Sequence, residues 1–203
     1  MLVYGKEHGA QDAAGLVSVK NVASQGMMEK NGFVVTSRWI YCYSSINIHQ
    51  EPDTGQATIA KLKDKEIIRS YLKQSQIFRA AAENYVDFWR WYHLDLDSDV
   101  LQNLIDNRKI IIMDTHSSII NGVVIINKYN NNMFQIGYID ASDVLTLRHL
   151  IAFVINLAYS ELGEKKSETL QMFVPQTSFL QSVMTDLEIS HYGNFLLYRM
   201  EFS

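Results

Sequence analysis

NVASQGMMEKNGF, residues 21–33, is the stretch that decides the fold. Asn21 is a residue type that commonly caps a helix N-terminus, and Gly32 suits the position just after a helix ends. Met27 and Met28 give the intervening segment an apolar face. The stretch therefore predicts a short helix that begins at Asn21 and ends before Gly32.

The segments on either side of this helix have the composition of strands. Residues 15–19 are a short β-prone run, and residues 33–43 are rich in β-branched and aromatic side chains. The only cysteine, Cys42, lies in the second run and is expected to be a small buried hydrophobic residue rather than a nucleophile. The predicted order is strand, helix, strand.

The spacing of this stretch resembles N-x-x-A/S-x-x-L/M-Y-E-K-x-G-F, which closes the acetyl-CoA-binding core of the GCN5-related N-acetyltransferase (GNAT) superfamily. The positions in register are Asn21, Ser24, Met27, Glu29, Lys30, Gly32 and Phe33. Met28 stands where the family usually has tyrosine. The resemblance implies acetyl-CoA as acyl donor, with Asn21 and Ser24 near the pantetheine or phosphate region of the coenzyme.

The resemblance also implies that residues 1–45 form the C-terminal part of a GNAT domain. In that fold the strand at residues 15–19 would be the fifth of the sheet, and the glycine-rich pyrophosphate loop would lie before it. Since half a sheet cannot bury its own faces, we expect residues 1–45 to pack against another part of the assembly.

Residues 46–64 are poor in apolar side chains and contain turn-forming Pro52 and Gly55, so they predict a linker. Residues 65–203 then predict a second, complete unit. Its expected helices cover residues 66–74, 99–107, 143–162 and 176–187, its expected strands cover 109–113, 119–127, 134–139, 169–174 and 195–202, and a turn is expected at 191–194.

That order of elements is the GNAT order a second time. The fold class expected for the whole chain is therefore α/β (α+β), with a mixed, mostly antiparallel sheet flanked by helices. A partial GNAT-like unit would be followed by a complete, degenerate one, as in a tandem protein.

The second unit lacks the expected phosphate loop. A bound pyrophosphate needs backbone N–H groups at a helix N-terminus, with glycines that allow close approach. Residues 139–148 read IDASDVLTLR and contain no glycine. Asp140 and Asp143 would bring negative charge there, and Asp143 or Ser142 suits a helix cap instead. We therefore expect the second unit not to bind coenzyme A in the usual manner.

No catalytic residue can be assigned from the sequence. The thioether of Met28 cannot donate a proton to a leaving thiolate, as a tyrosine could. The sequence Asp114-Thr-His116 is read as the tip of a hairpin. The histidines show no metal-ligand spacing, so no metal site is expected. They are His8, His49, His93, His116, His149 and His191.

The aromatic side chains of residues 77–92 allow two interpretations. They could line the pocket of the acceptor substrate, or they could anchor the hydrophobic core. The second interpretation is favoured because large aromatic side chains dominate core burial.

Composition narrows the class of protein. The chain has 203 residues, of which 47% are hydrophobic and 20% charged, with a formal net charge of −4. Without a basic cluster, nucleic acid is not expected as a partner. No signal peptide or apolar run of membrane-spanning length is present, so we expect a cytoplasmic protein that is not inserted in a membrane.

Two hypotheses follow. In the first, the chain belongs to an acetyl-CoA-dependent N-acetyltransferase that acetylates an amine of an unidentified small molecule or protein. In the second, it is a non-catalytic binding or dimerisation module derived from the GNAT fold, whose unpaired strands join those of another copy.

Overall fold

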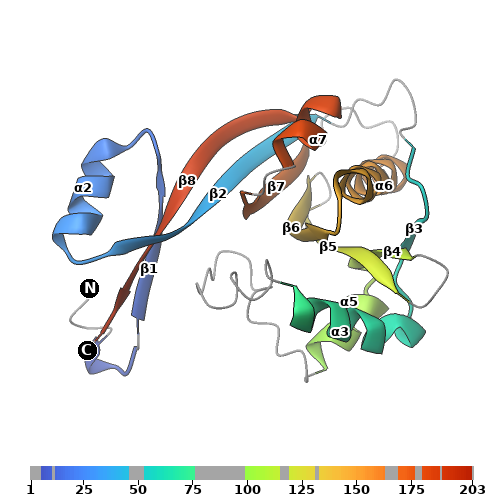
Figure 1. Ribbon diagram of the computed structural model, residues 1–203, viewed down its shortest axis with the longest axis horizontal. Coiled ribbons are helices and arrows are strands. Elements are labelled where there is room, and N and C mark those ends of the chain that lie inside the picture. The colour runs from blue at the N-terminus through green and yellow to red at the C-terminus, as the bar shows by residue number, and fades with distance from the viewer. Residues whose placement is uncertain are drawn as a thin grey trace.

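The computed structural model shows an elongated molecule in which one sheet runs through both predicted units (Figure 1). The structure describes residues 6–10, 12–45, 53–75, 99–114, 119–130, 133–162, 169–176, 180–187 and 189–202. The aromatic segment at residues 77–92 lies outside the described residues. Among the described residues, no helix is both long and apolar enough to cross a membrane.

Eight strands form the sheet in the order β1-β8-β2-β7-β6-β5-β4-β3. All neighbouring strands are antiparallel except β6 and β7, which run parallel. The strands are β1 (Asp12–Ser18), β2 (Val34–Ser45), β3 (Ala57–Ile59), β4 (Ile110–Asp114), β5 (Ile120–Asn130), β6 (Met133–Ala141), β7 (Thr169–Pro175) and β8 (Ser190–Glu201). The predicted fold class, a mixed and mostly antiparallel sheet flanked by helices, is confirmed.

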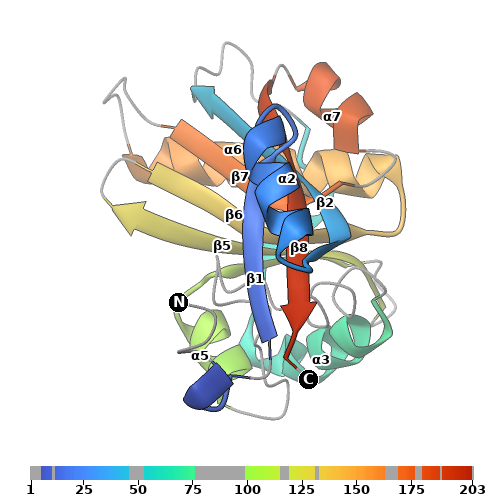
Figure 2. The same ribbon diagram turned by 90° about the vertical axis from the view of Figure 1, so that its left-hand side faces the viewer.

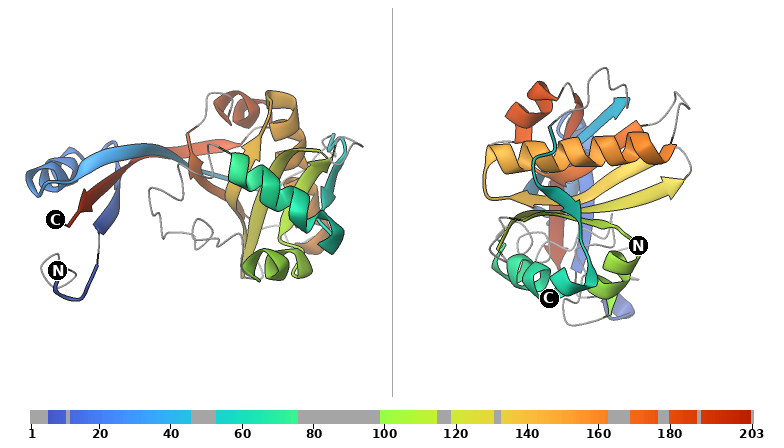
Figure 3. Two further views of the ribbon diagram at one scale, coloured as in Figure 1. Left: turned by 60° about the horizontal axis from the view of Figure 1, so that its bottom comes forward. Right: turned by 90° about the vertical axis from the view of Figure 1, so that its right-hand side faces the viewer.

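Helices cover both faces of this sheet (Figure 3). One apolar core lies beneath α6 and α7 and includes Phe134 and Ile136 of β6. A second core lies on the opposite face, beneath α3 and α5, and includes Trp39 and Tyr138. The helical segments are α2 (Val22–Lys30), η1 (Leu62–Asp64), α3 (Lys65–Gln74), α5 (Val100–Asp106), α6 (Val144–Leu162) and α7 (Leu180–Asp186).

The first and last parts of the chain exchange strands. The last strand, β8, lies between β1 and β2, while β2 lies between β8 and β7. Each strand–helix–strand segment, β1–α2–β2 and β7–α7–β8, therefore holds one strand of the other between its own two strands. The two predicted units are joined by this shared sheet rather than by a surface contact.

The two segments are also related by an approximate two-fold axis. β1 and β7 have seven residues each, and β2 and β8 have twelve each. In the central β2–β8 pair, Val34 is opposite Arg199 at one end and Tyr43 is opposite Ser190 at the other, so the first residue of each strand pairs with the tenth residue of the other. Each of these two strands contains one irregularity in register, as the two-fold relation requires. The pairing pattern is thus an internal structural repeat.

One local prediction, the turn at residues 191–194, was wrong, and the segment expected as a linker contains more regular structure than its composition indicates. The described part of the expected linker at residues 46–64 contains β3, which pairs with β4, and the helical turn η1. The expected turn at residues 191–194 is part of β8. In β3 and at the start of β8, pairing with another strand holds the chain extended, although the surrounding composition favours a loop or a turn.

Candidate functional site

Three polar side chains meet at the end of β6 that precedes α6. Asp140 Oδ2 accepts a hydrogen bond from Ser75 Oγ, just after α3. It also accepts one from the Tyr138 hydroxyl, over 3.3 Å. Ser75 Oγ and the Tyr138 oxygen are 3.0 Å apart. In the described part of the chain, no cationic side chain forms an ion pair with Asp140. The carboxylate is thus held by two hydroxyl groups and has no counter-ion among the residues that the structure describes.

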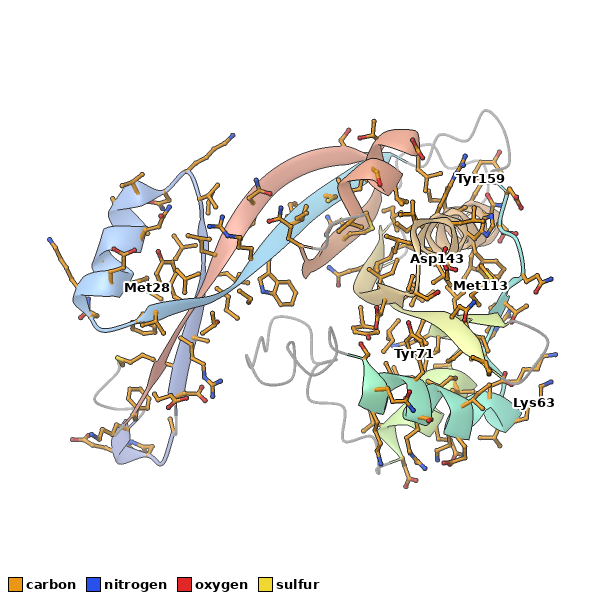
Figure 4. The ribbon with its side chains drawn as sticks, in the orientation of Figure 1. Met28, Lys63, Tyr71, Met113, Asp143 and Tyr159 are labelled. Carbon is orange, nitrogen blue, oxygen red and sulfur yellow. The ribbon has the colours of Figure 1, made fainter. Side chains whose placement is uncertain are left out.

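This cluster, Ser75–Tyr138–Asp140, is largely removed from solvent on the α3 side of the sheet. Tyr138 is 1% exposed and Ser75 is 8% exposed. Tyr71, one turn earlier on α3, lies between that helix and the sheet (Figure 4) and donates a hydrogen bond to the Asn121 carbonyl over 3.4 Å. Burial raises the pKa of Tyr71, and the negative charges of Asp140 and Asp143 raise it further. The local electrostatic potential therefore favours a cation.

The strands β6 and β7 separate beside this cluster. Their parallel pairing runs only from Met133–Thr169 to Ile136–Met172. Beyond that point β6 continues alongside β5 with an extra residue at Gly137, while β7 continues alongside β2. A bulge of this kind bends a strand and re-aims its side chains. The facing edges of the two strands are consequently not joined by regular pairing next to Asp140.

Gln135 of β6 points away from α6, because side chains alternate along a strand and its neighbours Phe134 and Ile136 pack beneath that helix. The extra residue at Gly137 shifts the alternation by one, so Tyr138 lies on the same face as Gln135. Gln135 is 1% exposed, and within the described residues its Oε1 atom has no hydrogen-bond partner. A buried amide oxygen without a donor is costly. The Gln135 amide oxygen is therefore an acceptor to which the described residues supply no donor.

Asp143 caps α6 and occupies its N-terminus. Its carboxylate accepts hydrogen bonds of 2.8 Å each from the Thr146 backbone N–H, the Thr146 hydroxyl and the Ser142 hydroxyl. These bonds, chiefly the backbone one, lower the pKa of Asp143. The prediction that Asp143 or Ser142 caps this helix is confirmed for Asp143. A carboxylate thus uses the donors that a pyrophosphate would need.

The first turn of α6 packs closely on the sheet because Gly122 of β5 has no side chain. A Cβ atom there would lie 2.7 Å from Leu150 Cδ1 and 2.9 Å from the Asp140 carbonyl oxygen. Glycine therefore fixes the position of α6 relative to β6, and with it the separation of Asp140 from Asp143.

Asn21 and Ser24, the residues predicted to contact coenzyme, lie at the start of α2 in the other half of the molecule (Figure 1). Asn21 Oδ1 accepts a hydrogen bond of 3.1 Å from the Ser24 backbone N–H, so the predicted cap is confirmed. Among the described residues the Asn21 amide nitrogen and the Ser24 hydroxyl have no further partner. The structure does not bring these two residues to the Asp140 cluster.

Other candidate groups have structural partners. Cys42 is buried, its Sγ atom lies 3.4 Å from Met184 Sδ, and burial raises the pKa of the thiol to about 12. The His149 ring lies 3.4 Å from Asp53, while His49, His93 and His116 lie outside the described residues. In the described segments, no three His, Cys, Asp or Glu side chains are grouped as metal ligands.

The Ser75–Tyr138–Asp140 cluster was not predicted from the sequence. Asp140 was expected only to bring negative charge to the place of a phosphate loop. The available signal was Tyr138-Ile-Asp140, two polar groups on one face of a strand just before a helix cap. Ser75 could not be found in this way because it is far from Asp140 in the sequence.

No protein-family model and no curated protein matches the chain. Solved structures do. A GCN5-related N-acetyltransferase from Sphaerobacter thermophilus matches 98% of the chain with a TM-score of 0.67 and 13% identity. A tandem GNAT protein from the clavulanic acid biosynthesis pathway matches 98% of it with a TM-score of 0.58 and 9% identity. The Saccharomyces cerevisiae N-myristoyltransferase with bound myristoyl-CoA matches 83% with a TM-score of 0.50 and 9% identity.

The chain has the GNAT fold. It spans 66% of the length of the Sphaerobacter and clavulanic acid pathway proteins and 49% of the N-myristoyltransferase. At identities this low, the likeness establishes the fold and leaves the chemistry to the residues of the site.

Proposed function

We propose that the chain is an acyl-CoA-dependent N-acetyltransferase that transfers an acetyl group from acetyl-CoA to an amine of an unidentified acceptor. Two proteins of the same fold support an acyl-CoA as donor: a tandem GNAT protein and an N-myristoyltransferase with bound myristoyl-CoA. The observation that carries the proposal is the Asp140 carboxylate, which is hydrogen-bonded to two hydroxyl groups without a cationic partner in the described residues.

A carboxylate in this setting suits the acceptor. An amine is protonated at neutral pH, and it must lose a proton before its nitrogen can attack a thioester. In the proposal Asp140 attracts the ammonium group and accepts that proton. The new C–N bond forms as the C–S bond breaks, and the Tyr138 hydroxyl donates a proton to the departing sulfur. The second proton of the attacking nitrogen returns to the Tyr138 oxygen, which leaves the amide, the free thiol and a protonated Asp140. Ser75 is a positioning residue that fixes both groups.

The residues of the second unit fit one end of the coenzyme and not the other. The edges of β6 and β7 beyond Ile136 and Met172 do not pair with each other, so their backbone groups are suited to the amides of a pantetheine arm. The α6 N-terminus does not suit the diphosphate, because Asp143 already occupies it. We propose that this unit recognises the thioester end of its donor.

Asn21 and Ser24 are proposed as coenzyme contacts of the first unit. After the cap is formed, the Asn21 amide nitrogen and the Ser24 hydroxyl remain as donors at a helix N-terminus, where an anion is favoured. Since α2 and α6 lie in different halves of the molecule, these residues would form a second coenzyme position, separate from Asp140.

The test is a thioester-cleavage assay with a panel of primary amines. Acetyl-CoA and S-acetyl-N-acetylcysteamine, a short donor without phosphates, serve as the two substrates. Asp140→Asn should lower kcat/KM for both donors at least about 100-fold, because positioned acid–base groups contribute roughly that much. Asp106→Asn, the same change at an exposed position on α5, should leave both rates unchanged.

A second variant separates the two ends of the donor. Asp143→Ser keeps a good cap but removes the charge. One charge at ~4 Å in water contributes about 1 kcal/mol, so KM for acetyl-CoA should fall about fivefold while KM for the short donor stays constant. Full activity of Asp140→Asn would refute the role of Asp140, and absence of turnover with either donor would refute the transferase proposal.

The second candidate is the binding or dimerisation module. It is favoured by β1, which lies at the end of the sheet with its outer edge uncovered by any described strand. An inactive chain that forms a dimer through β1 would support that candidate.

A further inference from the structure

The outer edge of β1 lacks the features that usually protect the edge of a sheet. β1 reads DAAGLVS and contains no proline, and its one charged residue, Asp12, forms an ion pair of 2.8 Å with Arg199. Free edges are usually protected by short length, proline or charge. The strand at the other end of the sheet, β3, has only three residues and so follows this rule. β1 does not.

The direction of individual backbone groups can be followed along β1. The Val19 backbone N–H donates to the Asn194 carbonyl over 3.0 Å. In an antiparallel pair, successive residues point alternately toward and away from the partner strand. The backbone groups of Ala14 and Leu16 therefore point away from β8, toward the side on which no described strand lies.

The internal repeat indicates which kind of neighbour fits the outer edge of β1. The equivalent strand, β7, is held to β2 by the matching bond from the Gln176 backbone N–H to the Arg38 carbonyl, also 3.0 Å. Its outer edge is occupied by β6, which pairs in parallel with residues 169–172. Aligned from the first residue of each strand, these correspond to residues 12–15 of β1.

The two helices of the repeat, α7 and α2, also differ in how far neighbouring elements bury them. α7 buries Leu180, Val183 and Met184 against the core beneath α6. α2 has no buried residue. Met27, which corresponds to Val183 by the matching hydrogen bonds at the two helix ends, is 57% exposed, whereas Val183 is 0% exposed. Figure 2 shows α2 and β1 at the front of the molecule, with no other described helix over them.

We propose that the edge of β1 and the exposed side of α2 form a docking surface for an additional strand–helix unit. Its strand runs parallel to β1 along residues 12–15, and its helix packs against Met27 as α6 packs near Val183. The unit is a further polypeptide segment with an apolar strand followed by an amphipathic helix. The pattern for this unit is the pair β6 and α6, which occupies the equivalent place beside β7 and α7.

The experiment uses the complete 203-residue chain and a synthetic peptide with the sequence of residues 133–162, which contains β6 and α6. The peptide copies the segment that occupies the equivalent place beside β7. Binding is measured by titration calorimetry, and amide hydrogen exchange locates it. The expected result is a 1:1 complex in which the Ala14 and Leu16 amides exchange more slowly.

Two variants test the two parts of the surface. Ala14→Pro removes an outward N–H from the edge, a change that edge strands tolerate. Met27→Glu places a charge on the exposed side of α2. Each should weaken peptide binding at least tenfold. Leu62→Glu, the matched change at another exposed apolar residue, should not alter it.

Three results would overturn the proposal: no binding at the solubility limit of the peptide, protection at β3 instead of β1, or a dimer of the chain that Ala14→Pro abolishes. The last would assign the edge to a second copy. Peptide binding does not depend on acyl transfer, so Asp140→Asn should retain it. Failure of either proposal can therefore be recognised separately.

Discussion

The segments β1–α2–β2 and β7–α7–β8 have the same pairing pattern and different surroundings. Both contribute a seven-residue and a twelve-residue strand to the sheet, and each encloses one strand of the other. Among the described residues, β7 has a parallel neighbour on its outer edge and β1 has none, and α7 packs against α6.

The comparison separates two contributions to a layered fold. Backbone pairing sets the register of the strands, and it is nearly identical in the two segments. Burial of side chains depends on what covers the helix and the sheet edge, and there the segments differ. Most of the stability of a helix in a protein comes from packing of its apolar face. The two helices should therefore contribute unequally to stability.

The largest effect is expected for Met184→Ala compared with Met27→Ala. Truncating the buried Met184 should lower the free energy of unfolding by about 2–5 kcal/mol, because it leaves a cavity between α7 and the sheet. The same change at the exposed Met27 should alter it by less than about 0.5 kcal/mol. Urea unfolding of the two variants measures the difference. Equal losses would show that Met27 is covered in solution and that the two segments have similar surroundings.

What the sequence could predict was local. The cap of α2 was predicted correctly because Asn21 and Ser24 are neighbours, and one hydrogen bond between them starts the helix. The cap of α6 at Asp143 was predicted for the same reason. The order of helices and strands followed from periodicity, which is also a property of short segments.

What the sequence could not predict depends on distant pairing. The exchange of β2 and β8 leaves the alternation of apolar residues unchanged, so no pattern distinguishes it from two separate sheets. The Asp140 cluster has the same origin, because Ser75 reaches it only after α3 has packed on the sheet. Local patterns indicate which residues form an element, and tertiary packing decides which residues meet.

A smaller effect is expected from Cys42, which joins the shared sheet to α7 through its contact with Met184. Burial raises the pKa of this thiol to about 12, above the value of about 8.5 in an unfolded chain. Because the folded state favours the protonated form, stability is complete below pH 8.5 and falls as the pH rises toward 12. Between pH 8 and 9.5 the loss should be about 1 kcal/mol.

Urea unfolding at these two pH values tests this effect, with Cys42→Val as the control. The variant fills a similar volume without a titrating group, so its stability should change less over the same interval. The corresponding position in the repeat is Tyr198, which is also buried and donates a hydrogen bond to Glu29 over 3.2 Å. An unchanged pH dependence in Cys42→Val would show that another group causes the loss.

The smallest effect on stability, and the sharpest one on the proposed coenzyme contact, is expected at Asn21. Asn21→Ala removes the cap of α2 and should cost about 1 kcal/mol, whereas Asn21→Ser keeps the capping oxygen and should cost almost nothing. Both variants lack the side-chain amide that we propose as a donor to coenzyme. One hydrogen bond contributes about 0.5–1.5 kcal/mol, so both should weaken acetyl-CoA binding about two- to tenfold in calorimetry. If binding weakens in Asn21→Ala and not in Asn21→Ser, the asparagine acts only through the helix cap, and the first segment would then differ from the second in its chemistry as well as in its covering.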